Sequence, residues 1–381
     1  MKKIIFVSFL AIFCNTVFSQ DTAKVKEFKP SGKVWGYAFG DLYYKLHADS
    51  SGRGGQQYSG AAYPKDANSF EFRRIYLGYD YTISEKFSTE LILAYEGQTL
   101  SDNATRTIFI KCANVRWKNI YKNADLVFGL MHSPAFPMLE EKIWSYRSIE
   151  KTLFDMRKIG SSTDLGLALQ GKIDTDGNYG YNLMVGNGTA QKIETDRFKK
   201  MSGDVYAKFM NKKIVVDIYA DYERSQLSPI HKSKMGFKGF LAYNSDKLTV
   251  GVEFFQQAQE NFSIHKDSVT ALKQDTTDIA VMGYGAFIRG TIIKDKLNFF
   301  ARYDWYSPDT KYDNSKYYIS YTAYNIENFI SAGIDFMPVK NVHIIPNIWY
   351  DSYSSRFKNI KGLAKYDNDL VLRLTIHYIF K

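Results

Sequence analysis

Two adjacent arginines are the residues of this chain best suited to binding an anion. Arg73 and Arg74 stand together in a segment rich in aromatic and β-branched residues. A guanidinium keeps its charge at any physiological pH and binds phosphate or carboxylate through paired hydrogen bonds. The pair therefore predicts a position at which a passing anion binds briefly, if one or both side chains line a channel. The alternative is a wall arginine that pairs with a carboxylate such as Glu90 on the neighbouring strand, and the sequence leaves both roles open.

The segment 132–162 carries a second group of charges. At about thirty residues it exceeds an ordinary connection and is not of low complexity, so we expect it to fold on itself. The stretch from Leu139 to Met156 has a helical composition. If the segment folds into a channel, it would narrow that channel, and the cations of the segment would attract anions. The alternative is an external loop whose charges pair with one another. The residues predicted to form this constriction are Glu140, Glu141, Arg147, Lys151, Arg157 and Lys158, with Glu150 and Asp155 as further carboxylates.

Catalysis and metal binding have little support. A hydrolase needs a nucleophile beside a general base, yet no inward serine accompanies His343 and His377, the histidines placed within strands. The segment from Asp174 to Asn178 comes nearest to a calcium loop but lacks the glycine and the glutamate of that motif where they are needed, so a tight turn is expected. Cys112 is expected to be a small filler on a strand. We therefore expect no enzymatic activity, no metal site and no cofactor.

The elements that must position the charged residues are β-strands. In the final segment, from Leu370 to Lys381, apolar residues ending in Tyr378 and Phe380 alternate with a second set that contains Arg373. A period of two is typical of a strand between lipid and water, although a strand of a soluble sandwich is the alternative for this segment alone. Such patterns predict sixteen strands, at 33–45, 70–82, 86–97, 106–117, 124–131, 163–173, 178–187, 202–210, 213–223, 235–244, 247–258, 278–290, 296–306, 326–336, 341–352 and 369–380.

The connections between these strands alternate in length. Odd-to-even connections are expected to be long and polar, as in 46–69, 224–234 and 259–277, whereas even-to-odd connections are short, as in 245–246. Long external loops and tight periplasmic turns are typical of an outer-membrane barrel, and a soluble sandwich has no reason to sort its loops in this way. The two consecutive arginines at 73–74 break the alternation of their strand, which predicts a β-bulge or a register shift there.

The N-terminus predicts export. Two lysines precede an apolar run from Ile4 to Phe13, and a cleavage site is expected between Ser19 and Gln20. No later segment approaches eighteen consecutive apolar residues, the length of a helical membrane span. Tyr and Phe, 29 and 27 residues, favour strands and membrane interfaces. We expect a signal peptide at 1–19, a short periplasmic segment at 20–32 and a transmembrane β-barrel at 33–381.

The net charge of +10 is assigned to the channel, the loops and the surface. An exported chain rarely meets nucleic acid, and no element clusters Lys and Arg with stacking aromatic residues, so no nucleic-acid partner is expected. The inward faces are expected to carry eight cations and nine carboxylates, which do not make an anion filter. Asp304 stands two residues from Arg302, which predicts a structural ion pair. The residues predicted to line the channel are Arg73, Arg74, Glu90, Arg302, Asp304 and Arg373.

Three groups of residues resemble the phosphate-selective porin O and P family and its Bacteroidetes-type relatives. The segment from Phe70 to Gly78 is similar to that family's arginine-rich second strand. The resemblance implies a sixteen-stranded homotrimeric channel for small solutes in the outer membrane of a Gram-negative bacterium. Lys381 departs from the family, because the last aromatic residue lies one position in from the end. The other matching residues are Ser133-Pro134, Trp144, Tyr146-Arg147, Glu150-Lys151, Asp164-Leu165-Gly166 and Pro346-Asn347.

These patterns predict an all-β fold, a transmembrane antiparallel barrel of about 16 strands with long external loops and short periplasmic turns. The predicted function is that of a passive porin for small polar or anionic solutes, phosphate among them, with outer-membrane lipid around it. The alternative is an outer-membrane barrel that serves as an adhesin or structural protein through external loops such as 46–69. A soluble secreted β-protein is the third and remotest interpretation.

Overall fold

The computed structural model describes residues 28–53, 64–97, 105–227, 230–266, 274–311, 325–355, 364 and 366–381. Within these residues, sixteen strands form one closed antiparallel barrel in which each strand pairs with the next along the chain and the last pairs with the first. The predicted signal peptide at 1–19 lies outside the described residues. In chain order the strands are β1 (Ser31–His47), β2 (Asn68–Thr82), β3 (Phe87–Glu96), β4 (Phe109–Tyr121), β5 (Ala124–His132), β6 (Thr163–Lys172), β7 (Tyr179–Gly186), β8 (Lys200–Phe209), β9 (Ile214–Leu227), β10 (Ile230–Asn244), β11 (Leu248–Lys266), β12 (Gln274–Ile293), β13 (Leu297–Ser307), β14 (Asn325–Val339), β15 (Val342–Ser355) and β16 (Tyr366–Phe380).

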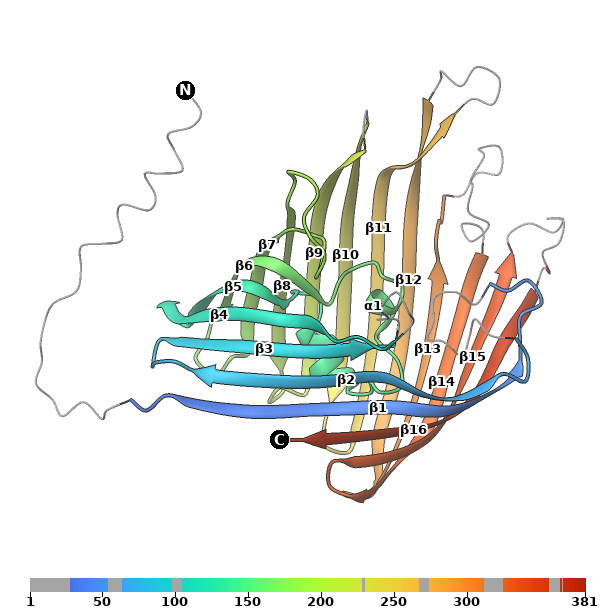
Figure 1. Cartoon of the computed structure of the whole chain (residues 1–381), viewed down its shortest axis with the longest axis horizontal. Coiled ribbons are helices and arrows are strands. Elements are labelled where there is room, and N and C mark those ends of the chain that lie inside the picture. Colours follow the sequence, from blue (N-terminus) through green and yellow to red (C-terminus); the bar gives the residue numbers. More distant parts are fainter. Residues whose placement is uncertain are drawn as a thin grey trace, which may run out of the picture.

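The two faces of each strand differ as the terminal segment predicted. On β16, Leu374 and Ile376 are 37% and 41% exposed on the outside, whereas Arg373 and Thr375 are at most 4% exposed on the inside. The predicted alternation of this strand is therefore confirmed. Figure 1 shows β1 to β3 crossing in front of β9 to β12, as expected for tilted strands on opposite walls of a barrel.

Two of the predicted long connections are wrong. The strands β9 and β10 are separated by residues 228–229 alone, so the segment 224–234 is mostly a hairpin. Likewise β11 and β12 extend into 259–277 and leave only 267–273 between them. The reason is that backbone hydrogen bonds continue a ladder through polar residues after the apolar alternation has stopped. The short even-to-odd connections are present as predicted, for example between β10 and β11.

The predicted irregularity at the two arginines is a β-bulge in β2. Phe39 of β1 pairs with Arg74 and the next residue, Gly40, pairs with Phe72, so Arg73 is inserted between the two pairs. Both arginine side chains consequently turn inward, and both are at most 1% exposed. A Cβ at Gly40 would lie 2.4 Å from the carbonyl oxygen of Glu71, so the bulge needs a glycine opposite it.

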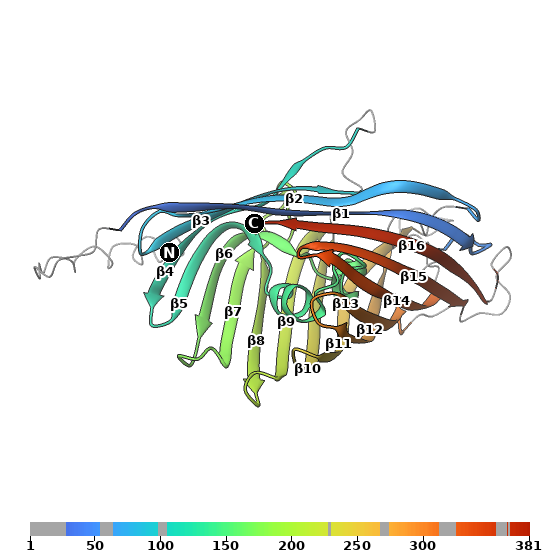
Figure 2. The same cartoon turned by 90° about the horizontal axis from the view of Figure 1, so that it is seen from below.

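The connection between β5 and β6 lies inside the barrel. It contains a π-helix, η2 (Pro137–Trp144), and a single turn of α-helix, α1 (Leu153–Met156). Figure 1 places α1 between the front wall and β11–β12, and Figure 2 shows the helical turns enclosed by the ring of strands. The stretch from Leu139 to Met156, which has a helical composition, contains most of η2 and all of α1 but is not one continuous helix, because Ser145 takes a left-handed conformation (φ 63°) that ends η2. No helix in the described part of the chain has the length and apolarity needed to cross a membrane.

Apolar residues of this inner segment form a core with the barrel wall. Leu153 and Phe154 pack against wall residues that include Phe255 of β11. Trp144 is fully buried, and its ring centroid lies 5.0 Å from that of Phe287 on β12. The inner segment is therefore fixed by burial of large side chains, which is the strongest of the available stabilising terms.

We predict that Trp144→Ala lowers the free energy of unfolding by about 3–5 kcal/mol, because it leaves a cavity between the inner segment and the wall. The matched control is Trp117→Ala, since Trp117 is 38% exposed on the outside of β4. The measurement is denaturant unfolding of both variants refolded in the same detergent micelles. Equal losses in the two variants would contradict a structural role for the inner core.

Candidate functional site

The barrel wall holds the inner segment 133–162 by its backbone carbonyl groups. The donors are side chains of β2, β10, β11, β12 and β13, so the segment is bound from opposite sides of the barrel. A charged donor makes a stronger hydrogen bond than a neutral one, and a carbonyl acceptor constrains the position of the backbone. The segment is thereby fixed as a bridge across the interior. The hydrogen bonds are Arg73 to Ile149 (2.9 Å) and to Ser148, Lys238 to Ala135 (2.7 Å), Gln257 to Ile159 (3.2 Å), Arg289 to Ile143 (2.8 Å) and Arg302 to Lys151.

Asp41 on β1 connects the closing strands of the barrel to this bridge. Its carboxylate forms ion pairs with Arg73 of β2 and Arg373 of β16, and it accepts a hydrogen bond from Thr375 at 2.5 Å. Arg73 also donates to the carbonyl groups of Ser148 and Ile149 in the inner segment. Arg73 and Arg373 were both predicted to line the channel. In the structure both are buried and hold the wall together through Asp41, and Arg73 also binds the inner segment.

Arg302 and Asp304 form the structural ion pair that their spacing predicted. The guanidinium donates to both carboxylate oxygens, from Nε at 3.0 Å and from Nη2 at 2.5 Å. Arg302 also donates to the carbonyl group of Lys151. Both residues are buried. This pair, like Asp41 and its partners, fixes the inner segment against the wall.

The alternative of a wall arginine that pairs with a carboxylate on the neighbouring strand is confirmed for Arg74, but the carboxylate is Glu96 and not Glu90. Glu90 stands opposite Asp80 in the β2–β3 register and accepts a hydrogen bond from Asn114 Nδ2 at 3.0 Å. Arg74 stands opposite Glu96 instead, and the two charged groups are 3.8 Å apart. The difference arises from strand register, which the sequence pattern alone does not specify to one residue.

A cluster of paired charges lies where the inner segment faces the β2–β4 wall. Arg147 of the segment forms ion pairs with Glu140 and Asp155, the latter at 3.1 Å. Lys151 approaches Asp155 to 3.5 Å. On the wall, Lys111 lies 3.0 Å from Glu96. We call these residues the charged cluster; its members are Arg74, Glu96, Lys111, Glu140, Arg147, Lys151 and Asp155.

Lys111 is a member of the cluster that the alternation pattern missed. In the β3–β4 register, Ile92 pairs with Cys112 and Leu93 pairs with Ile110, so Lys111 is inserted by a second bulge. Lys111 and Cys112 both turn inward as a result, and both are buried. A regular strand would have placed only one of the two inside, and the sequence carries no visible break of alternation at this point.

Charge attraction within the cluster controls the ionisation of Asp155. Burial alone would raise the pKa of this carboxyl group, but the nearby Lys151 and Arg147 outweigh burial and hold the pKa below its usual range. Glu150 behaves in the opposite way: its burial raises the pKa, and the attraction of Arg73 offsets that effect only in part. The paired cations therefore favour the ionised form of Asp155.

The remaining predicted constriction residues have separate roles in the structure. Arg157 is buried and forms an ion pair with Glu327 of β14, so it also attaches the inner segment to the wall. Lys158 and Glu141 are exposed to the interior cavities on opposite sides of the inner segment. The structure thus brings Glu140, Arg147 and Lys151 together and leaves Glu141, Arg157 and Lys158 outside the cluster.

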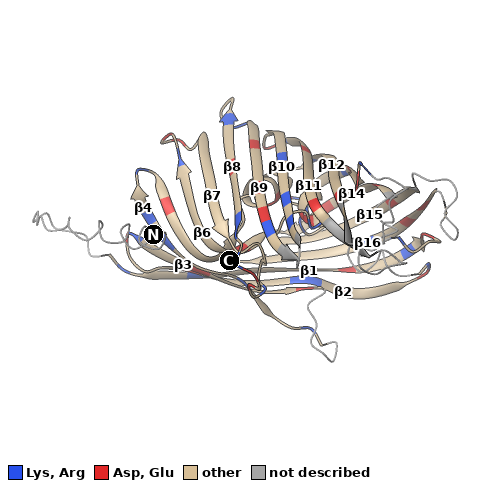
Figure 3. Cartoon of the chain, turned by 90° about the horizontal axis from the view of Figure 1, so that it is seen from above, with Lys and Arg blue, Asp and Glu red and all other residues tan. Residues whose placement is uncertain are grey.

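An outer cavity of about 450 Å³ lies on the side of the inner segment that faces the long connections. Within the described ranges, Lys158, Lys192 and Lys234 have no carboxylate within 4.0 Å, and all three line this cavity. The cavity therefore carries an excess of positive charge. Figure 3 shows the wider setting, in which basic and acidic positions lie next to one another on β9 and β10. The six lysines that line the cavity are Lys111, Lys151, Lys158, Lys192, Lys200 and Lys234, with Glu96, Asp155, Asp164 and Glu223 as the carboxylates.

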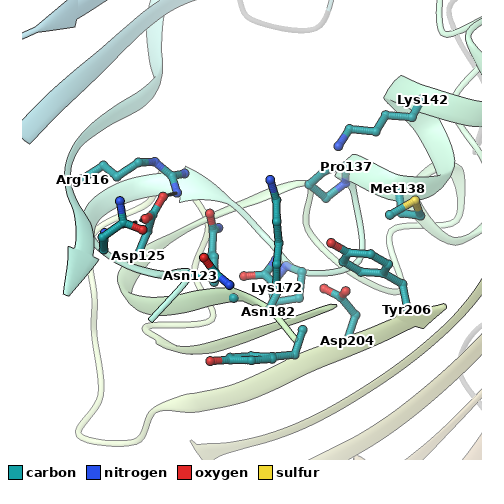
Figure 4. A pocket seen from close by; sticks show the side chains of 15 residues that line it. Arg116, Asn123, Asp125, Pro137, Met138, Lys142, Lys172, Asn182, Asp204 and Tyr206 are labelled. Carbon is teal, nitrogen blue, oxygen red and sulfur yellow. Dashed lines mark hydrogen bonds and ion pairs between the residues drawn. The ribbon is translucent and has the colours of Figure 1, made fainter. Parts of the chain in front are cut away.

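Two cavities on the other side of the inner segment are more balanced in charge. One, of about 330 Å³, lies between η2 and the turn end of β4 to β8, where Lys142 and Lys172 approach Asp204 and Tyr206 (Figure 4). The second, of about 500 Å³, lies between η2 and β1, next to the C-terminal residue. In the described residues, no three His, Cys, Asp or Glu side chains are grouped so that they could hold a metal ion.

Comparison with solved structures finds similar folds among outer-membrane proteins. No protein-family model matches this chain, and no curated protein sequence matches it. The chain is similar in structure to an anion-selective porin from Comamonas acidovorans, with a TM-score of 0.61, 10% identity, and coverage of 92% of this chain and 100% of that chain. It is also similar to the outer-membrane channel DcaP of Acinetobacter baumannii (TM-score 0.61, 14% identity, coverage 92% and 97%). A third similar structure is the trimer form of OmpT, an outer-membrane protein of Vibrio cholerae (0.56, 9%, 92% and 99%).

The lowered pKa of Asp155 gives a pH prediction for the inner segment. A carboxyl group whose pKa is lower in the folded than in the unfolded state stabilises the fold above its unfolded pKa of about 3.9, and this contribution is lost as the pH falls through the folded value. The wild-type protein should therefore be more stable than Asp155→Asn at pH 7 and at pH 5, and the difference should begin to shrink below about pH 4 and disappear only below the lowered folded pKa. Denaturant unfolding at each pH measures it. A difference that is already lost at pH 5 would contradict the assigned ion pairs.

Proposed function

We propose that this chain is an outer-membrane porin that lets small polar or anionic solutes diffuse passively through a channel narrowed by residues 133–162. The observation that carries the proposal is a long connection fixed inside a closed barrel, with the charged cluster between it and the β2–β4 wall. A closed barrel of this strand number encloses space for an aqueous path. A segment bound across that space narrows the path without any chemical step.

The outer surface of the barrel suits a lipid bilayer. Its strands present apolar side chains outward along their length, as Leu372, Leu374 and Ile376 do on β16. Aromatic side chains follow at the strand end, where Tyr378 and Phe380 are exposed. An apolar band ending in aromatic residues is the arrangement that a membrane barrel needs. Together with the expected signal peptide at 1–19, this supports an outer-membrane location.

The charge distribution supports entry of small anions, with phosphate as one member of the class. The three lysines without carboxylate neighbours in the outer cavity raise the local concentration of anions. In the charged cluster beyond them, three carboxylates pair with all four basic groups, so the cluster does not form a ring of unpaired cations. We therefore propose a modest preference for anions. The similar porin from Comamonas acidovorans is described as anion-selective, which agrees with this choice.

A homotrimer is proposed for the assembly. The resemblance to the phosphate-selective porin family implies it, and one similar structure is a trimer form. The mass of the detergent-solubilised protein tests this, and a mass of one chain would contradict it. The adhesin alternative rests on the loop 46–69, whose central residues, 54–63, lie outside the described residues.

We predict opposite changes in ion selectivity when single charges of the cluster are removed. Arg147→Ala leaves Glu140 and Asp155 without their shared cation, so the permeability ratio should shift about fivefold toward cations. Asp155→Asn should shift it toward anions by a similar factor. The measurement is the reversal potential of reconstituted channels in a salt gradient. Lys86→Ala is the control, because Lys86 is exposed in the β2–β3 turn and should leave the ratio unchanged. Unchanged selectivity in both cluster variants would remove the cluster from the channel.

The lipid-facing assignment predicts a depth-dependent cost of charge. Leu374→Arg places a cation near the middle of β16 and should cost about 2–4 kcal/mol of folding free energy, whereas Phe380→Arg at the strand end should cost about 1 kcal/mol or less. Reversible unfolding from lipid bilayers measures both. Equal costs at the two positions would count against a bilayer around the barrel.

A further inference from the structure

The cavity beside β1 has an aromatic wall that a channel for inorganic ions does not require. Its volume of about 500 Å³ falls within the range of small-molecule sites, about 300–1,000 Å³. On the barrel side it is lined by Trp35, Tyr37 and Phe39, which alternate along the inward face of β1. We call these three residues the aromatic strip. On the other side lie Glu141 and Arg147 of the inner segment.

The rings of the strip are arranged in nearly parallel planes. The ring centroids of Trp35 and Tyr37 are 6.5 Å apart with an interplanar angle of 14°, and those of Tyr37 and Phe39 are 6.3 Å apart with an angle of 4°. These spacings follow from the two-residue repeat of the strand. Tyr76 of β2 packs beside Tyr37 at 4.7 Å and supports the strip. Trp35 and Tyr37 are therefore preorganised beside the cavity, whereas Phe39 is only 1% exposed and supports them.

The indole ring of Trp35 packs against the backbone of Gly78. A Cβ at this position would lie 2.2 Å from Cε2 of Trp35, so the ring rests on the bare backbone of β2. The indole Nε1 donates a hydrogen bond to Asp80 Oδ2 at 3.0 Å, which fixes the orientation of the ring. Trp35 and Tyr37 are only half-buried, so part of each ring faces the cavity. The glycine that follows the two arginines thus has a role in shaping this cavity.

Polar groups with capacity for further hydrogen bonds surround the strip. The carboxylate of Glu141 is exposed and has no ion pair or hydrogen bond with any described residue. Asp80 is also exposed and uses only one carboxylate oxygen for Trp35. The guanidinium of Arg147 lines the same cavity while it pairs with Asp155 of the charged cluster. The cavity therefore offers both acceptors and a donor next to flat apolar rings.

We propose that the aromatic strip and these polar groups form a binding subsite for a neutral sugar on its way through the channel. A pyranose ring has a face of C–H groups that can lie on aromatic rings and a rim of hydroxyl groups that can bond to Glu141, Asp80 and Arg147. An inorganic anion makes no use of aromatic rings, and the cavity offers it no excess of positive charge, because Lys33, Arg147 and Lys381 are balanced by Asp80, Glu140 and Glu141. The inference rests on the proposed porin function and adds a class of solute to it.

The test is the block of ion current by maltose in planar bilayers containing the full-length protein in potassium chloride. Maltose should reduce the current with a saturable concentration dependence. Sorbitol, which has hydroxyl groups but no ring, should not do so. The half-blocking concentration should rise about tenfold in Trp35→Ala, the factor expected for the loss of one stacking ring. Trp117→Ala is the matched control, because that indole lies on the outside of the barrel and should leave the block unchanged.

A second variant tests the geometry without removing the ring. In Gly78→Leu the new side chain displaces the indole ring of Trp35 from its position against β2. The half-blocking concentration should therefore also rise about tenfold. Channels that conduct potassium chloride but show no saturable block by maltose would overturn the sugar proposal and leave the porin function standing. A block that inorganic phosphate produces and maltose does not would overturn it too. Absence of any conductance would instead refute the proposed function itself.

Discussion

The structure depends on one buried carboxylate, that of Asp41. A buried charge is tolerated only when it is paired, and removing one partner of such a pair costs about 3–5 kcal/mol. Asp41 is paired with Arg73 of β2 and Arg373 of β16, so the strands that close the barrel are joined by charge as well as by backbone hydrogen bonds. Arg73 extends the same network to the carbonyl groups of the inner segment. Closure of the barrel and placement of the inner segment thus depend on the same network of buried charges.

The placement of the inner segment determines what remains open inside the barrel. Apolar packing around Trp144 fills the side toward β12, and the charged cluster occupies the side toward β2 to β4. Beyond the cluster in one direction lies the lysine-lined cavity, and in the other lies the aromatic strip. A solute on this path would meet positive charge first, then a narrow region of balanced charge, and finally an apolar surface. Each zone follows from where the segment is bound.

Much of the fold could be predicted from the sequence, because alternation of apolar and polar residues is a local property. It predicted sixteen strands, the faces of β16, the irregularity at Arg73 and the pairing of Arg302 with Asp304. What it could not predict depends on register and on tertiary packing. The bulge at Lys111 leaves no trace in the pattern, and the partner of Arg74 is set by which residue of β3 stands opposite. Likewise, the buried positions of Arg73 and Arg373 depend on partners that are far away in the sequence. These are the carbonyl group of Ile149 for Arg73 and the carboxylate of Asp41 for Arg373.

The proposed function requires an aqueous path that passes the inner segment within the closed barrel. The most direct measurement is the single-channel conductance of the purified protein in a planar lipid bilayer. We expect stable, discrete current steps whose size is proportional to the applied voltage at low voltage. They should be smaller than those of a barrel of this strand number without an inner segment. Protein that inserts into the bilayer but produces no stable current steps would contradict the proposed function.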